Sequence, residues 1–281
     1  MRLNTEYLFR EIDTKEENDV SGYDALVFNS GSSFIYGQIL KPDGAWGGNR
    51  PCVIMFHGFA GFGRFDDVAQ ALCRAGCVVI IPHHRGAWGS EGYYSFTNCI
   101  EDAVNLANYA RSEDFTERYC TDPEAIFLLG HSMGGNTSVN AAARLDFLRG
   151  IILLAPCDIS AIYKASSDES LMNFLVDNGG EILHSRGLDY LFADVKDNAD
   201  KMLFTANAEK ICRMNVFLAA GRRDDVCPPE LTAEPLMNEL EKYKTGAIRI
   251  NRLYDADHSL MAVRVKLTYE IANFINAALN E

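Results

Sequence analysis

Short, uninterrupted apolar runs alternate with longer helix-like stretches through most of this 281-residue chain. Runs such as residues 52–56 and 151–154 contain no charged side chain, so we expect both faces of each strand to be buried, as in parallel sheets. Repeated βα units of this kind build a doubly wound sheet. The sequence therefore predicts an α/β fold with a mostly parallel central sheet and helices on both faces. Strands are expected at 52–56, 77–81, 125–129, 151–154, 216–220 and 247–253, and helices at 65–75, 98–111, 133–146, 229–242 and 260–279.

The first forty residues have a different pattern. Residues 7–12, 23–29 and 34–40 are short and rich in aromatic and β-branched residues, which favours strands. Gly31-Ser32-Ser33 between the last two predicts a hairpin turn.

The regular alternation stops after Leu154. About sixty residues precede the next expected strand, far more than a βα connection needs. Residues 170–177 and 198–209 within this stretch look helical. We therefore expect residues 1–281 to form a single domain that carries a small helical cap insertion at 159–211.

Composition excludes several classes of partner. The net charge of −13 disfavours binding to nucleic acid and to anionic membranes. The first residues lack the apolar run of a signal peptide, and no stretch reaches the roughly 18 apolar residues of a membrane span. The eight cysteines are scattered without a C-x-x-C pair, which favours buried, reduced thiols in a cytoplasmic protein.

Gly130-His131-Ser132-Met133-Gly134 matches the G-x-S-x-G pattern. It follows an expected strand and precedes an expected helix, the context of a nucleophile elbow. A sharp strand-to-helix turn needs glycine two residues before and after the serine, because larger side chains would collide. The turn presents Ser132 at the carboxyl end of the sheet and places the Met133 N–H at a helix start, where an anion is favoured.

A serine alcohol needs a general base, and that base needs a group that fixes its tautomer. Only His184 and His258 follow Ser132, and His184 falls in the expected insertion. His258 lies between the last strand and the last helix, so it is the predicted base. Asp224 and Asp225, just past the strand at 216–220, are both candidates for the acid.

The tetrahedral oxyanion needs a second N–H donor. Residues 57–61, with glycines at 58 and 61, follow the strand at 52–56 and reach the same sheet edge. We expect the Phe59 N–H to pair with the Met133 N–H. Adjacent His83 and His84 would point to opposite faces of extended chain, and no His, Cys, Asp and Glu set has zinc-site spacing, so no metal is predicted. Arg85 is expected in a structural ion pair.

These motifs, spread over about residues 20–281, resemble those of the α/β-hydrolase superfamily. The pattern is similar to bacterial feruloyl and cinnamoyl esterases and to the catalytic domains of prolyl-oligopeptidase-type enzymes. The acid in that family commonly occurs as G-x-x-D-x-x-x-P, and Gly221 and Pro228 place it at Asp224. The family usually has Asp where this chain has His83 or His84.

The resemblance implies a Ser132-Asp224-His258 triad, oxyanion donors at Phe59 and Met133, and no cofactor. We expect a serine hydrolase of the carboxylesterase type, acting on a small-molecule ester through an acyl-enzyme. A serine amidase or peptidase acting on a short peptide or amide is the alternative with the same residues. A non-catalytic, ligand-binding member of the fold is the alternative outside enzymes.

Overall fold

The computed structural model describes residues 2–12, 19–62 and 64–280, and these contain one eight-stranded sheet in the order β1-β2-β4-β3-β5-β6-β7-β8. β1 and β2 form an antiparallel hairpin, β2 runs antiparallel to β4, and the remaining neighbours are parallel. The prediction of a mostly parallel sheet is confirmed. The strands are β1 (Gly22–Ser30), β2 (Ser33–Lys41), β3 (Arg50–Phe56), β4 (Val78–Pro82), β5 (Thr121–His131), β6 (Gly150–Leu154), β7 (Asn215–Gly221) and β8 (Arg249–Tyr254).

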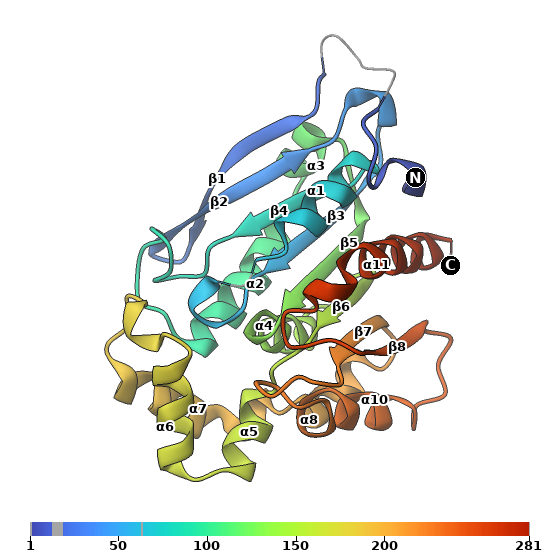
Figure 1. Cartoon of the computed structure of the whole chain (residues 1–281). Helices are drawn as coiled ribbons and strands as arrows, with labels where there is room; N and C mark the ends of the chain where they lie inside the picture. Colours follow the sequence, from blue (N-terminus) through green and yellow to red (C-terminus); the bar gives the residue numbers. More distant parts are fainter. Residues whose placement is uncertain (1, 13–18, 63, 281) are drawn as a thin grey trace.

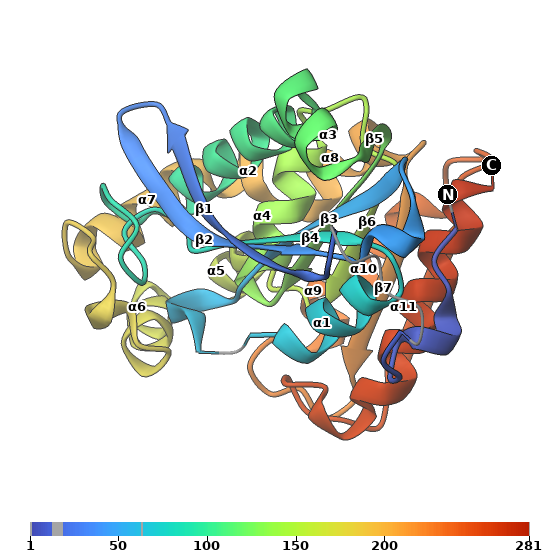
Figure 2. The same cartoon turned by 90° about the horizontal axis from the view of Figure 1, so that it is seen from above.

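Helices cover both faces of the sheet (Figure 2). α1 (Asp66–Arg74) and α11 (Arg264–Leu279) pack together on one face, and α2 (Phe96–Arg111) and α4 (Met133–Ala142) pack together on the other. Successive residues of β3 show the consequence, since Val53 joins the core under α1 and α11 while Ile54 joins the core under α2 and α4. Apolar residues on both faces explain why the strands are continuous apolar runs.

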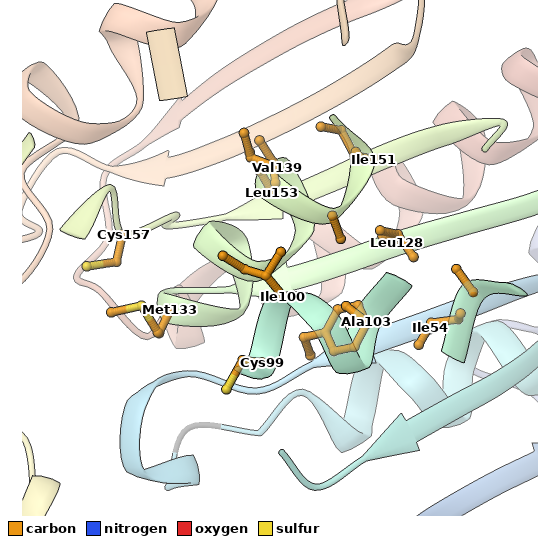
Figure 3. Packing of buried hydrophobic residues seen from close by; sticks show 14 of the residues in the cluster. Ile54, Cys99, Ile100, Ala103, Leu128, Met133, Val139, Ile151, Leu153 and Cys157 are labelled. Carbon is orange, nitrogen blue, oxygen red and sulfur yellow. The ribbon is translucent and has the colours of Figure 1, made fainter. Parts of the chain in front are cut away.

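The larger core joins side chains from strands and helices that are distant in sequence. Figure 3 shows Ile54 of β3, Leu128 of β5 and Ile151 of β6 beside Ile100 of α2 and Val139 of α4. All five are fully buried. This packing fixes the position of α4, and therefore of the turn from β5 into α4.

Four helices separate β6 from β7: α5 (Ile159–Ala165), α6 (Asp168–Asp177), α7 (Leu188–Met202) and α8 (Phe204–Ile211). α5, α6 and α7 gather beyond the carboxyl ends of the parallel strands (Figure 1). α8 instead packs against α4 and α10 (Glu234–Leu240), beside the sheet. The segment thus extends over the strand ends while α8 ties it to the main body. The short elements η4 (Gly180–Ile182) and α9 (Pro229–Thr232) complete this half of the chain.

Several sequence expectations differ from the structure. The helix expected at 229–242 is divided into α9 and α10, and the helical stretch expected at 198–209 is divided at Leu203 between α7 and α8. The strand predicted at 7–12 is wrong, because η1 (Thr5–Tyr7) forms there, with the Asn4 side chain accepting from the Glu6 N–H at 3.2 Å. The following carbonyl, of Leu8, accepts from the Arg74 side chain of α1 rather than from a neighbouring strand. α3 (Glu113–Tyr119) was not predicted. It follows α2 without a loop, because Ser112 is both the last cap of α2 and the first cap of α3. The other short helices are η2 (Gly44–Trp46), η3 (Phe59–Gly61) and η5 (Met261–Val263).

No helix in the described ranges combines the length and apolar character needed to cross a membrane. The eight cysteines, all within those ranges, are free thiols, and Cys120 is the exposed one among them.

Arg85, in the loop between β4 and α2, forms a partly buried ion pair with Asp102 of α2. Its Nε donates to Asp102 Oδ2 at 3.2 Å, and a second guanidinium nitrogen contacts the other carboxylate oxygen. The Ser30 hydroxyl also donates to Asp102, at 2.6 Å. The structural ion pair expected for Arg85 is therefore present, and it joins the β1–β2 hairpin, the β4 loop and α2.

Asp102→Asn is expected to lower the free energy of unfolding by about 3 kcal/mol, because it leaves the Arg85 guanidinium buried without its counter-charge. Urea unfolding at neutral pH measures this. Glu101→Gln is the matched control: Glu101 approaches the same guanidinium at 3.7 Å but is exposed, so about 0.5 kcal/mol or less is expected. Equal effects of the two substitutions would contradict this role for the Asp102 pair.

Candidate active site

Ser132 occupies the turn between the last residue of β5 and the first residue of α4. Its backbone has φ 54° and ψ −118°, which is strained for a residue with a side chain. The backbone is held in this shape because the Ser132 N–H donates to the Leu154 carbonyl at 3.0 Å and the Ser132 carbonyl accepts from the Cys157 N–H at 2.9 Å. The side chain remains at the surface of a cavity, with 7% of the residue exposed.

The glycines around Ser132 are required by the closeness of three backbone segments. A Cβ on Gly130 would lie 2.0 Å from the Gly134 carbonyl oxygen, and a Cβ on Gly134 would lie 2.1 Å from the Phe56 carbonyl oxygen. Backbone atoms cannot yield as a flexible side chain could. The steric argument made from the G-x-S-x-G pattern thus describes the observed packing.

His258 and Asp224 are in direct contact. The His258 Nδ1–H donates to Asp224 Oδ2 at 2.8 Å, which leaves Nε2 without the proton in the neutral ring. The other carboxylate oxygen, Oδ1, accepts from the backbone N–H groups of Val226 and Cys227 at 3.1 and 2.8 Å. Asp224 is buried, and its orientation is therefore fixed by three hydrogen bonds.

The neighbouring carboxylates make other contacts. Asp225 is exposed and lines the cavity. Asp255 pairs with Arg223 at 3.0 Å, and Asp257 accepts from the Ser259 N–H and hydroxyl at 3.1 and 2.7 Å. Of the four acidic residues near His258 or the end of β7, Asp224 is the one that the fold brings to the imidazole.

His131 supports the loop that carries His258. Its Nε2–H donates to the His258 carbonyl at 3.1 Å, and its ring centroid lies 4.9 Å from that of His258 and 4.7 Å from that of Phe65. The Arg264 guanidinium lies 3.4 Å from the Phe65 centroid. Sequence reasoning missed this contact, because His131 and His258 are 127 positions apart in the sequence and no pattern indicates that they meet.

The Phe59 loop lies directly against the elbow. A Cβ on Gly58 would lie 3.1 Å from the Ser132 Cβ, so glycine permits the approach. Within the described part of the chain, neither the Phe59 N–H nor the Met133 N–H donates to another group of the protein. Phe59 and Met133, the residues predicted to supply the oxyanion donors, both line the cavity described below.

His57 holds the base of this loop as a neutral ring. Its Nδ1–H donates to the Gly58 carbonyl at 2.8 Å, and its Nε2 accepts from the His84 N–H at 3.2 Å. Burial lowers the pKa of His57 from 6.5 to about 4, so the ring stays uncharged near neutrality. The imidazole therefore makes its Nδ1 hydrogen bond within the loop that carries Phe59.

A cavity of about 540 Å³ opens over Ser132 and His258. Apolar side chains form much of its wall, and the carboxylates of Asp177, Asp225 and Asp257 also border it. Among the described residues, neither Lys nor Arg lines it. The apolar lining residues are Phe59, Phe62, Met133, Phe174, Val176 and Val226.

The Ser132 and His258 side chains share this cavity without a hydrogen bond between them in the described structure. The buried Cys227 thiol lies near the Ser132 hydroxyl, and burial raises the pKa of Cys227 well above its ordinary value.

The apolar side chains of residues 159–211 divide between the cavity and the core. Phe174 and Val176 line the cavity, whereas the following residues are buried in the main core: Leu171, Leu175, Leu191, Met202 and Phe204. Residues 2–12, 19–62 and 64–280 contain no group of three or more His, Cys, Asp and Glu side chains arranged to hold a metal ion.

Comparison with known proteins agrees with this architecture. A family model described as Serine aminopeptidase, S33 (Hydrolase_4) matches residues 47–177, a little under half of the chain. Monoglyceride lipase of Rattus norvegicus is 30% identical over 162 residues, which cover 54% of this chain and 50% of that protein. The chain thus matches about half the length of the curated relatives found.

Solved structures support the fold over nearly the whole chain. Est1E from Butyrivibrio proteoclasticus with ferulic acid bound has a TM-score of 0.71 at 17% identity, covering 92% of this chain and 100% of that one. The Pyrococcus horikoshii acylaminoacyl peptidase has a TM-score of 0.67 at 16% identity, covering 92% of this chain and 41% of that one. The chain has the α/β-hydrolase fold, and about half of it is similar in sequence to serine hydrolases.

The neutral state of His57 predicts a pH dependence of stability. Its pKa in the folded protein, about 4, lies below the ordinary value of 6.5, so the unfolded chain binds the proton more readily. Its contribution to stability is therefore present above pH 6.5 and is lost as the pH falls toward 4, by at most about 1.4 kcal/mol per pH unit.

The unfolding free energy of the wild type is expected to fall between pH 6.5 and 4. In His57→Gln this fall should be shallower by up to about 1.4 kcal/mol per pH unit, the slope that one proton contributes. Urea unfolding across this range measures it, and His184→Gln, which replaces an exposed imidazole, is the control. An unchanged slope in His57→Gln would contradict the buried neutral ring.

Proposed function

We propose that this protein is a carboxylic ester hydrolase that works through an acyl-enzyme on Ser132, with His258 as general base and Asp224 as the orienting acid. The observation that carries the proposal is the hydrogen bond to the buried Asp224 from the Nδ1–H of His258, which lines the same cavity as Ser132. This pairing leaves His258 Nε2 as a proton acceptor facing the same cavity. Phe59 and Met133 N–H are the proposed oxyanion donors.

The first half of the reaction acylates Ser132. As Ser132 Oγ attacks the ester carbonyl carbon, its proton passes to His258 Nε2, and the carbonyl π electrons move onto oxygen. The Phe59 and Met133 N–H groups stabilise that oxyanion, and the Asp224 carboxylate stabilises the imidazolium. Collapse of the intermediate breaks the bond to the alcohol oxygen, which takes the proton from His258.

The second half restores the enzyme. Water attacks the acyl carbon while its proton passes to His258 Nε2, and the same N–H groups hold the second oxyanion. Collapse releases the carboxylic acid, and Ser132 Oγ takes the proton back. These steps use only the side chains and N–H groups already named, with no cofactor.

Residues 159–211 are proposed as a cap within a single domain. α6 contributes Phe174, Val176 and Asp177 to the cavity wall, so this segment would shape the acyl or alcohol site. Its apolar wall suits a small ester with an uncharged hydrocarbon or aryl group. The free, mostly buried cysteines fit a reducing compartment, and we propose a cytoplasmic location.

Ser132→Ala is expected to reduce kcat/KM for p-nitrophenyl butyrate by at least about 10³-fold, and Asp224→Asn by about 10²-fold or more. Asp225→Asn is the matched control, because it removes the adjacent, exposed carboxylate and is expected to stay within about threefold of wild type. Hydrolysis retained in Ser132→Ala, or equal losses in the two aspartate variants, would contradict the assignments.

An amidase or peptidase acting on a free amino terminus is the second candidate, and a specific feature favours it. Asp177, Asp225 and Asp257 border the cavity, and Lys and Arg are missing from its described lining. Such a rim attracts an ammonium group. The matching family model is described as a serine aminopeptidase, which is in line with this reading.

Three substrates separate the candidates: p-nitrophenyl butyrate, leucine p-nitroanilide and N-acetyl-leucine p-nitroanilide. As an esterase, the protein is expected to hydrolyse the butyrate with the highest kcat/KM, and a higher value for the free-amine anilide would make it a peptidase. If the acidic rim attracts the ammonium group of a substrate, Asp177→Asn should lower turnover of leucine p-nitroanilide about two- to threefold at low salt. Turnover of the acetylated anilide, which has no charged amine, should not change. Asp146→Asn, an exposed site at the opposite end of the sheet, is the control.

A further inference from the structure

Trp88 has a strained backbone conformation in the loop between β4 and α2. The Ser90 N–H donates to the Ala87 carbonyl at 3.0 Å, which closes a tight turn with Trp88 and Gly89 in the middle. Both central residues have positive φ, 51° and 94°. Glycine and asparagine accept this backbone readily, whereas a bulky aromatic residue is strained there. Trp88 is also 50% exposed, so burial does not account for it.

The indole makes one polar contact in the described structure, and that contact is to the Phe59 loop. Trp88 Nε1–H donates to the Ala60 carbonyl at 2.8 Å. Ala60 itself has a positive φ of 58°, so this turn is strained as well. A Cβ on Gly61 would lie 2.1 Å from Trp88 Nε1, so the indole fills the space that Gly61 leaves open.

Two peptide groups connect this hydrogen bond to the proposed oxyanion donor. The Ala60 carbonyl shares its peptide group with the Gly61 N–H, which donates to the Gly58 carbonyl at 3.0 Å. The Gly58 carbonyl in turn shares its peptide group with the Phe59 N–H. Trp88 therefore stands at the head of a chain of hydrogen bonds that ends at Phe59 N–H.

We propose that Trp88 is a positioning residue for the oxyanion hole. Its N–H fixes the Ala60–Gly61 peptide, which fixes and polarises the Gly58–Phe59 peptide, because hydrogen bonds in a chain strengthen one another. His57 Nδ1–H donates to the same Gly58 carbonyl from the other side. The Phe59 N–H is thereby held in place before substrate arrives, as electrostatic stabilisation of an oxyanion requires.

Hydrogen bonds to neighbouring segments hold the loop that carries Trp88 in place. The Ser90 hydroxyl donates to the His83 carbonyl at 2.9 Å and accepts from the Tyr36 N–H of β2 at 3.0 Å. The His184 N–H, from the segment between β6 and β7, donates to the Gly86 carbonyl at 2.8 Å. These bonds hold the strained turn so that the indole N–H remains directed at Ala60.

Trp88→Phe keeps an aromatic ring but removes the N–H donor together with the five-membered ring, and Trp88→Leu removes the aromatic ring altogether. Both are expected to lower kcat for p-nitrophenyl butyrate about tenfold with KM within about twofold, because the interaction lost acts on the transition state. Affinity for a trifluoromethyl ketone, which forms an oxyanion adduct, should fall by the same factor. Trp46→Phe, at the other tryptophan of the chain, is the matched control and should leave all three unchanged.

An unchanged kcat in Trp88→Phe would overturn the proposal, as would a rise in KM alone, which would make Trp88 a residue of the cavity entrance. The proposal for Trp88 rests on the proposed ester hydrolase function. NMR distinguishes failure of the Trp88 proposal from failure of that function. The Phe59 and Gly61 amide protons should shift upfield in Trp88→Phe in the absence of any substrate. Unchanged Phe59 and Gly61 amide signals in an active Trp88→Phe enzyme would refute the hydrogen-bond chain but not the function. Absence of Ser132-dependent ester hydrolysis in the wild type would refute the function but not the hydrogen-bond chain.

Discussion

Close backbone packing around the turn from β5 into α4 is the constraint on which the rest of the site depends. Gly130, Gly134 and the Phe56 carbonyl meet at distances that leave no room for a Cβ. This packing holds Ser132 in a strained backbone conformation and brings the end of β3 against it. Relaxing any of these contacts would separate the serine from the loop that carries Phe59. The hydrophobic packing of α4 on β3, β5 and β6 holds the arrangement together.

The sheet order then gathers the remaining groups. β3, β5, β7 and β8 run parallel, so the residues that follow them emerge at one edge. Phe59, Ser132, Asp224 and His258 each follow one of these strands, although they are distant in sequence. Local hydrogen bonds complete the placement: Asp224 is fixed by Val226 and Cys227, and His258 is held through its carbonyl by His131.

The parts of this arrangement that sequence could anticipate are those with local causes. Uninterrupted apolar runs indicate strands buried on both faces, and G-x-S-x-G between a strand and a helix indicates a glycine-packed turn. The strand predicted at 7–12 was wrong because a backbone segment becomes a strand only beside a partner, and Leu8 meets an arginine side chain instead. His131 beneath His258 and Trp88 on Ala60 depend on tertiary contacts without a periodic signal. The acidic rim likewise combines carboxylates from the end of α6 and from the loops after β7 and β8, which only the fold brings to one cavity.

Ser132 is the residue proposed to become acylated. Mass spectrometry of the protein after covalent labelling of its nucleophile tests this most directly. The wild-type chain would be treated with a fluorophosphonate, digested, and sequenced by tandem fragmentation. We expect one adduct per chain, on Ser132, and no adduct in Ser132→Ala. An adduct on a different residue, or an unmodified protein that still hydrolyses esters, would contradict the account.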